Sequence, residues 1–222
     1  MRTHGAGAMA VVVLSAFAEA SLAAPGVDSA RVLEAARNGN VEAMRAIGPG
    51  ALPELVRLYR ESTTSERAQI ARLFYGLGWK SEEAKRALLQ DVHTSDTDLR
   101  LQVQWALGRV SDDPAVVDVL LDNMRHDPQP LFRDKAACAL AYDQIHLAPA
   151  QKLRLFEGLI GALDDGEPQV RQVAIQALAI LTSQTKGYQS LAGPEERRAS
   201  VEAWRRWLAE YRTNVSPRTA SR

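Results

Sequence analysis

Apolar residues recur along the chain with the spacing of helix faces, in segments separated by short polar turns. The segments align on four arginines, Arg67, Arg100, Arg133 and Arg171, which are 33, 33 and 38 residues apart. Positions three, six and seven residues after each arginine are apolar, and these offsets share one side of an α-helix. The pattern therefore predicts four helices, each with a buried stripe. The stripe residues are Ile70, Leu73, Phe74, Val103, Ala106, Leu107, Ala136, Ala139, Leu140, Ala174, Ala177 and Leu178.

A second leucine column predicts a helix before each of these four. Twelve residues before the arginines lie Leu55, Leu88, Leu121 and Leu159. Six residues before them lie Glu61, Thr94, Asp127 and Asp165, which are acidic in three of four cases. Proline at 130 and 168 suits the first turn of a helix, where an N–H is not needed. Each unit is thus a first helix, a turn and a second helix, and such units bury a core by stacking on one another.

The last unit resembles a HEAT repeat. In "LIGALDDGEPQVRQVAIQALAIL" (159–181), a leucine-rich helix is followed by a turn aspartate, a proline, valine-arginine and spaced alanines. Upstream the motif is weaker, because Thr94 replaces the acid and "TTSER" (63–67) lacks the proline. The resemblance covers residues 50 to 183. The matching residues of the last unit are Leu159, Leu163, Asp165, Pro168, Val170, Arg171, Ala174, Ala177 and Leu178.

This resemblance implies an all-α fold, a right-handed α-α superhelix. We expect a HEAT-like solenoid of about four helix pairs with N- and C-terminal capping helices. The expected organisation is a signal peptide (1–23), N-terminal capping helices (24–50), HEAT-like repeats (51–183), a C-terminal capping segment (184–212) and a disordered tail (213–222).

The turn carboxylates and arginines are interpreted as structural clips. Placed along one edge of the stack, they can pair within a repeat or with its neighbour and fix the stacking register, each pair contributing modestly. Binding of a ligand by the arginines is the alternative. The proposed clip residues are Glu61, Arg67, Arg100, Asp127, Arg133, Asp165 and Arg171.

Both ends of the repeat region read as caps. Residues 28–48 predict one or two short helices broken at Asn38-Gly39-Asn40. At the other end, Pro194 opens a helix on which Val201, Trp204, Leu208 and Tyr211 share a face, with Trp207 beside them. Its tryptophans are expected to pack against the open end of the core, as terminal repeats require.

The N-terminus has the pattern of an export signal. Arg2 and His4 precede the short apolar run "AGAMAVVVLSAFA" (6–18), and small residues follow, so cleavage is expected after Ala20 or Ala23. An apolar N-terminal helix is the alternative. The run is shorter than the roughly 20 residues of a membrane helix, so no stable membrane insertion is expected after cleavage. The predicted location is outside the cytoplasm, periplasmic or secreted.

Composition argues against nucleic acid as the main partner. Lysine plus arginine number 27 and aspartate plus glutamate also 27, whereas proteins that follow phosphate backbones carry a basic excess. Cys138 is the only cysteine, so no internal disulfide can form.

No reactive constellation appears in the sequence. It contains no Gly-rich phosphate loop, no serine nucleophile motif and no His-Glu pair of the kind that iron-binding HEAT hydroxylases use. His93 and His126 occupy one repeat column, but adjacent helices are too far apart for routine shared metal ligation. We therefore expect no enzyme activity, no catalytic or metal-binding residues and no cofactor.

A protein partner is expected on the outward side of the second helices. Trp105 and Leu101 lie four residues apart there, which places them side by side on a helix. Alternatively, Trp105 packs against an adjacent ridge or under the insertion "DQIHLAPA" (143–150). The predicted partner-binding residues, which have the composition of an interface hot spot, are Arg72, Tyr75, Leu101, Trp105, Arg109 and Tyr142.

The sequence thus predicts a non-catalytic protein-protein interaction scaffold of the HEAT-repeat type in the cell envelope. A HEAT-type auxiliary enzyme or lyase-like protein acting on a bound protein is the alternative. The identity of the partner is not encoded in any recognisable motif.

Overall fold

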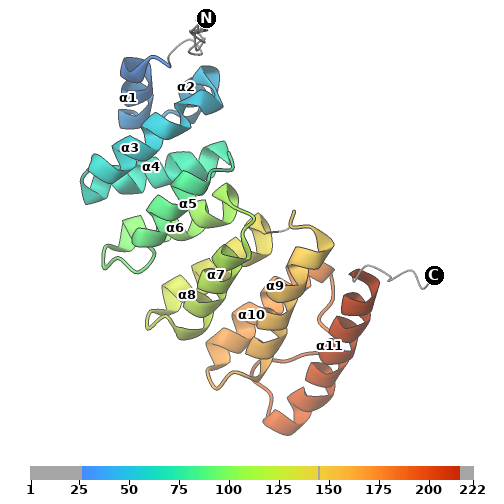
Figure 1. Ribbon diagram of the computed structural model, residues 1–222. Helices are drawn as coiled ribbons and strands as arrows, with labels where there is room; N and C mark the ends of the chain where they lie inside the picture. The colour runs from blue at the N-terminus through green and yellow to red at the C-terminus, as the bar shows by residue number, and fades with distance from the viewer. Residues whose placement is uncertain (1–26, 145, 216–222) are drawn as a thin grey trace, which may run out of the picture.

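The chain folds into stacked pairs of antiparallel helices (Figure 1). The computed structural model describes residues 27–144 and 146–215, and this part of the chain is helical with no strand. The first helix of each of the four pairs is α3 (Leu52–Glu61), α5 (Glu82–Gln90), α7 (Pro114–His126) or α9 (Pro149–Gly161). The second helices are α4 (Thr64–Leu77), α6 (Thr97–Val110), α8 (Pro130–Cys138) and α10 (Pro168–Thr182). The predicted all-α solenoid of four helix pairs is confirmed.

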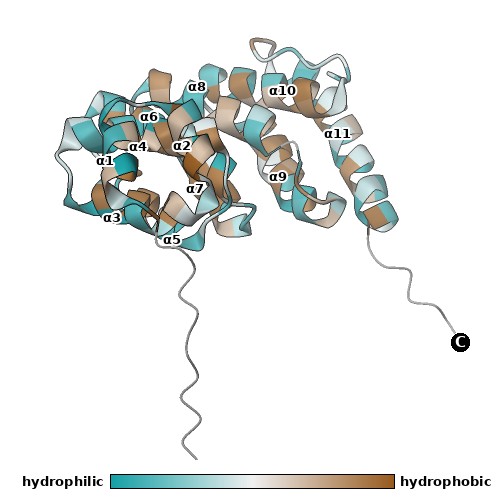
Figure 2. Cartoon of the chain, turned by 90° about the horizontal axis from the view of Figure 1, so that it is seen from above, coloured by the Kyte–Doolittle hydropathy of each residue, from teal (hydrophilic) through white to brown (hydrophobic). Residues whose placement is uncertain are grey.

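The predicted apolar columns form its core. All twelve stripe residues of the second helices are at most 4% exposed, and the leucine column of the first helices is at most 8% exposed. Each second helix packs on the next, α4 on α6, α6 on α8 and α8 on α10. Figure 2 shows the second helices along one side of the stack and the first helices along the other, each with hydrophobic and hydrophilic residues. Burial of these stripes between neighbouring repeats is the main stabilising term.

Local signals set where the helices begin. Thr63 and Glu66 form a capping box at the start of α4, in which the Thr63 N–H donates to the Glu66 carboxylate at 2.9 Å. The Asp96 carboxylate accepts from the Leu99 N–H at 2.8 Å at the start of α6. Helices α7 to α10 instead begin with proline, whose fixed φ suits the first turn.

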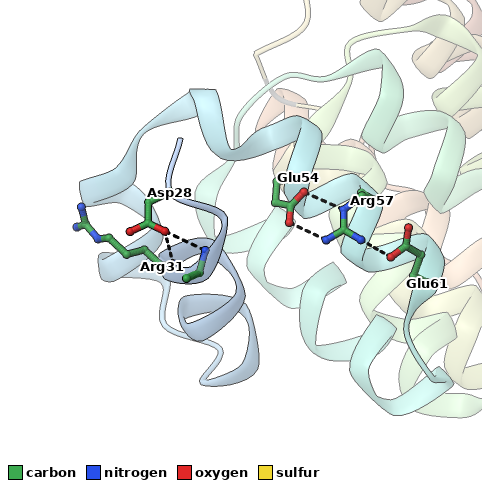
Figure 3. Close-up of polar contacts among 6 residues, drawn as sticks. Asp28, Arg31, Glu54, Arg57 and Glu61 are labelled. Atoms are coloured by element: carbon green, nitrogen blue, oxygen red, sulfur yellow. Dashed lines mark hydrogen bonds and ion pairs between the residues drawn. The ribbon is translucent and has the colours of Figure 1, made fainter. Parts of the chain in front are cut away.

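The N-terminal end carries α1 (Ser29–Arg37), α2 (Val41–Ile47) and the 3-10 turn η1 (Pro49–Ala51). The two helices break at Gly39, whose φ of +58° favours glycine. Figure 3 shows Asp28 accepting from the backbone at the start of α1, and Arg57 between Glu54 and Glu61 on α3. The predicted signal peptide (1–23) lies outside the described residues.

The C-terminal end is closed by α11 (Pro194–Val215), which packs on α9. Trp204 is fully buried, and Trp207 stacks edge-on against Phe156 with ring centroids 4.9 Å apart. The helix continues to Val215, so the disordered tail expected from residue 213 is wrong for residues 213–215. The reason is that this end of α11 is docked, since Arg212 pairs with Glu157 of α9 at 2.6 Å. Residues 216–222 lie outside the described part.

The longer third repeat contains a local change of helix type. After α8 the chain continues as the π-helical turn η2 (Ala139–Asp143), where one extra residue widens the turn. The following Gln144 and Leu147 are buried, and the Gln144 amide donates to the Gly108 carbonyl at 2.6 Å. The short 3-10 turn η3 (Ala162–Asp164) follows directly after α9. No helix in the described part is long and apolar enough to cross a membrane.

Candidate protein-binding surface

The outward side of the second helices contains an aromatic and cationic cluster. Tyr75 of α4 and Trp105 of α6 have ring centroids 6.1 Å apart. The guanidinium carbon of Arg109 lies 4.8 Å from the centre of the Tyr75 ring, within range of a cation-π interaction. Both aromatic residues are half-buried and pack against the core. We call these three residues the Tyr75–Trp105–Arg109 cluster.

The other three predicted binding residues are more varied in exposure and contacts. Arg72 of α4 pairs with Asp98 of α6 at 3.5 Å, and both side chains are about 60% exposed. Leu101 is half-buried one turn before Trp105. Tyr142 is 59% exposed on η2. The structure thus brings three of the six predicted residues together, and their role in binding stays a prediction.

An open hollow lies between α8–η2 and α10. Its volume is about 420 Å³. Tyr142 and Ile180, two of the few large apolar side chains that are substantially exposed, line it. Asp134 is the one formally charged residue in its lining, and it pairs with Lys135 at 2.9 Å. The complete lining is Asp134, Ala137, Cys138, Ala141, Tyr142, Val173, Gln176, Ala177, Ala179 and Ile180.

A second hollow continues the apolar surface beyond α10. It shares Gln176 and Ala179 with the first and has a volume of about 390 Å³. Leu191, in the segment before α11, lines it and is 83% exposed. Exposed apolar groups concentrated over adjoining hollows are typical of protein-binding surfaces. This region is the C-terminal half of the second-helix face.

One buried ionisable group lies beside the cluster. The side chain of Asp143 is only 4% exposed, and its carboxylate lies 3.6 Å from the Arg109 guanidinium. Burial raises the pKa of Asp143 to about 6, although the charges of Arg109 and Lys80 lower it. The approach is close because Gly108 has no side chain, and a Cβ there would lie 2.8 Å from that of Asp143. The fold therefore places a carboxyl group that titrates in the physiological range next to a surface arginine.

The arginine column contacts the turns in two ways. Arg67 pairs with Asp91 at 2.9 Å, and Arg100 pairs with Asp127, in each case in the next repeat. Arg133 donates to the Asp127 carbonyl at 2.6 Å, and Arg171 donates to the Asp165 carbonyl at 2.7 Å, both in their own repeat. These contacts join helices to turns, and a structural role for the column stays a prediction.

Glu61 does not take the expected place in this ladder. It is exposed and pairs with Arg57, one turn earlier on α3, so the expected pairing with an arginine of the column is wrong for Glu61 (Figure 3). The reason is geometric: the Arg67 side chain extends to the next repeat, where its guanidinium donates to the Asp91 carboxylate. Asp165 differs again, since its carboxylate lies 3.5 Å from Arg125 of α7.

Potential metal ligands do not gather at one place in the described part of the chain. No group of three His, Cys, Asp or Glu side chains in this part of the chain could hold a metal ion. His126 lies 2.8 Å from Asp122 on the exposed side of α7, and His93 is exposed. Burial raises the pKa of the Cys138 thiol, and nearby Asp134 adds to the effect. A thiol with a raised pKa is a poor nucleophile at neutral pH.

Two buried carboxyl groups near this surface were not predicted from the sequence, Asp91 and Asp143. The alignment expects the turn carboxylate six residues before each arginine, which is Thr94 in this repeat. Asp91 lies three residues earlier, so the alignment did not include it. Asp143 was assigned to an insertion, and nothing in the local sequence indicates that its carboxyl group is buried against α6. The extra length of this repeat was the available signal, since extra residues in a regular array often mark a π-turn or a loop.

Comparison with known proteins identifies the repeats. The family model described as HEAT repeats matches residues 52–141, from the start of α3 into η2. The match ends before the unit at 159–181, where the motif residues are most complete. The comparison with curated proteins gave no match.

Among solved structures, the chain is similar to a designed armadillo repeat protein in complex with the peptide (KR)4. The two share 15% sequence identity with a TM-score of 0.49, over 87% of this chain and 85% of that one. The match to the family model identifies residues 52–141 as a HEAT-repeat segment, set within an all-α solenoid.

Proposed function

We propose that this chain is a non-catalytic scaffold that binds a protein partner in the cell envelope, through the outward side of its second helices. The observation that supports this most is the hollow between α8–η2 and α10, where Tyr142 and Ile180 remain exposed. Stacked helical repeats commonly present such surfaces to protein partners.

The Tyr75–Trp105–Arg109 cluster extends this surface toward the N-terminal repeats. Aromatic and arginine side chains are enriched among residues that dominate binding energy. Because Trp105 is half-buried, its exposed edge would contact a partner while its inner face packs on the core. Location in the envelope rests on the export-signal pattern of residues 1–23.

Affinity capture from envelope extracts tests the proposal. The bait is the mature chain beside two double variants, Trp105→Ala with Leu101→Ala and Tyr142→Ala with Ile180→Ala. A matched control is Arg86→Ala, on the exposed side of first helix α5. We expect one specific protein on wild type and control and its loss from at least one double variant. Capture of the same proteins by all four folded baits would rule out this surface.

Localisation needs a separate measurement. Mass spectrometry of the chain recovered from cells gives its first residue. A mature N-terminus after Ala20 or Ala23 in the envelope fraction is expected, and a chain that retains Met1–Ala23 in the cytoplasm would contradict the envelope assignment.

A further inference from the structure

The N–H donors of Arg109 are only weakly used, although the side chain lies between Asp143 and the Tyr75 ring. Its guanidinium is 3.6 Å from the Asp143 carboxylate, longer than the roughly 2.9 Å of a good hydrogen bond. The side chain is 38% exposed and stacks on Tyr75, which fixes its position without using its N–H donors. The guanidinium of Arg109 is therefore already positioned to donate hydrogen bonds to a carboxylate of a partner protein. The Asp143 carboxylate competes with that partner for the same N–H groups.

A second arginine lies on the same side of the stack as the cluster. Arg72 precedes Tyr75 by three residues on α4, so the two side chains share one side of that helix. Its pairing with Asp98, at 3.5 Å and with both side chains mostly exposed, is of the kind that contributes little and opens easily. Two arginines beside two aromatic rings fit a segment that alternates carboxylates with apolar side chains.

Protonation of Asp143 changes the charge available at this place. The charged groups that face it are Arg109 of α6 and, more weakly, Lys80, which is itself paired with Asp112 at 2.6 Å. On α8, Cys138 is an ionisable neighbour of Asp143, and Asp134 and Lys135 lie close to that thiol. Among the described residues, α7 and α10, which also pack on η2, add no charged group that shifts the Asp143 pKa.

The buried position determines the direction of the change. The pKa of Asp143 is about 6, so the carboxyl group becomes neutral on mild acidification. A neutral carboxyl group is easier to bury than a carboxylate, so it has no reason to leave the core. Arg109 then loses its internal counter-charge while Tyr75 still holds it in place.

We propose that Arg109, with Arg72, Tyr75 and Trp105, binds an acidic segment of a partner protein, and that protonation of Asp143 strengthens this binding by releasing Arg109. The proposal rests on the proposed scaffold function and names the chemistry of the partner and a regulation of the same surface.

Binding of synthetic peptides to the full chain tests this. The probe is a fluorescent (Asp-Leu)4 peptide with blocked ends, and the comparison peptide is (Lys-Leu)4. Aspartate in a peptide has an ordinary pKa near 3.9, so the probe stays charged at both pH values used, about 7.5 and about 5.5. For a group titrating near 6, affinity of wild type for (Asp-Leu)4 should rise up to roughly twentyfold at the lower pH.

Three variants separate this mechanism from general acidification. Asp143→Asn should bind the acidic peptide at the higher pH as wild type does at the lower one, with little pH dependence. Arg109→Gln should lose binding at both. Arg86→Gln, on the first-helix face, should behave like wild type. A general effect of acidification on the surface would strengthen binding in all variants alike, so the flat profile of Asp143→Asn is the deciding result.

If Asp143→Asn does not fold, a spectroscopic titration of the wild-type protein tests the same mechanism. The carboxyl carbon of Asp143 in wild type, followed by NMR, should titrate near pH 6 with the same midpoint as peptide binding. Equal affinity at both pH values, preference for (Lys-Leu)4, or a midpoint near the ordinary aspartate pKa each overturns the proposal. If the Arg109→Gln variant still captures the partner protein, the proposed scaffold function is retained, and only the recognition of an acidic segment by Arg109 is excluded.

Discussion

At the scale of single residues, the least ordinary side chain is Asp143. A carboxyl group with 4% exposure is costly to ionise, and one partner at 3.6 Å compensates only in part. The same residue lies in the π-turn and against Gly108, so its position follows from the backbone of two repeats. The buried acid is thus a consequence of how the third repeat packs on the second.

The pH dependence of stability should reveal this group. Its pKa is about 6 in the folded chain against 3.8 without burial, so the folded chain binds more protons between these values. The contribution of Asp143 to the free energy of unfolding is therefore fully present below about pH 4 and is lost as the pH rises through about 6. Urea unfolding at about pH 7.5 and 5.5 should show wild type gaining stability on acidification and Asp143→Asn gaining less. Identical pH profiles for the two proteins would exclude this role.

Some residue-scale features follow from the sequence and others do not. Helical offsets from the arginine column were enough to place the buried stripe and to put Tyr75, Trp105 and Arg109 on one outward side. Periodicity describes one helix at a time, so it could not predict that Arg67 meets Asp91 or that Asp143 turns inward. Those contacts depend on the rotation between neighbouring repeats.

At the scale of helices, the most buried ion pair between repeats in the described part of the chain joins α6 to the residue after α7. The Asp127 side chain has no exposure and Arg100 has 11%, and the Arg100 guanidinium also lies 4.3 Å above the Phe132 ring. By contrast, Arg57 on α3 pairs with Glu54 and Glu61 at the surface of a single helix (Figure 3). The contribution of each arginine to the free energy of unfolding should depend more on its burial than on its number of partners.

Replacement of these two arginines by methionine separates the effects. Arg100→Met leaves the Asp127 carboxylate buried without its cation and should lower the free energy of unfolding by about 3–5 kcal/mol. Arg57→Met should lower the urea midpoint much less, since Arg57 and Glu61 are at least half exposed and Glu54 keeps some access to water. An equal effect of the two substitutions would show that the buried pair does not fix the stacking of the repeats.

The closing helix α11 depends on its tryptophans. Trp204 has no exposure, and its indole N–H donates to the Thr185 carbonyl at 3.3 Å. Trp204→Ala should therefore cost about 3–5 kcal/mol of stability, as other large-to-small core changes do. Arg206→Ala, on the exposed side of the same helix, is the control. Hydrogen exchange should show faster exchange in α11 and α9 for the tryptophan variant alone; unchanged protection would mean that α11 is not a cap.

Helix boundaries were predictable where capping residues mark them. Asp28, the break at Gly39 and the prolines that open α8, α10 and α11 gave the expected starts. The end of α11 was not predictable, because the ion pair of Arg212 with Glu157 depends on docking against α9. The π-turn after α8 was indicated only by the extra length of that repeat.

At the scale of the whole molecule, the two sides of the stack differ in chemistry. The hollow between α8–η2 and α10 has one charged residue in its lining, Asp134, and is otherwise mostly apolar. A hollow on the first-helix side is lined instead by Arg57, Arg60, Glu61, Glu83 and Arg86, among others. Among the described residues, the large apolar side chains that are substantially exposed belong to second helices, to η2 or to the segment before α11: Leu131, Tyr142, Ile180 and Leu191. This asymmetry is what a one-sided protein-binding scaffold requires.

Photo-crosslinking in cells tests this central claim most directly. A photoreactive phenylalanine analogue replaces Tyr142 on the second-helix side or Arg86 on the first-helix side, both exposed. The account predicts a discrete protein adduct from position 142 that is absent from position 86, and that disappears when Ile180→Ala is added. Adducts from position 86 alone, or the same adducts from both positions, would contradict a binding surface on the second helices.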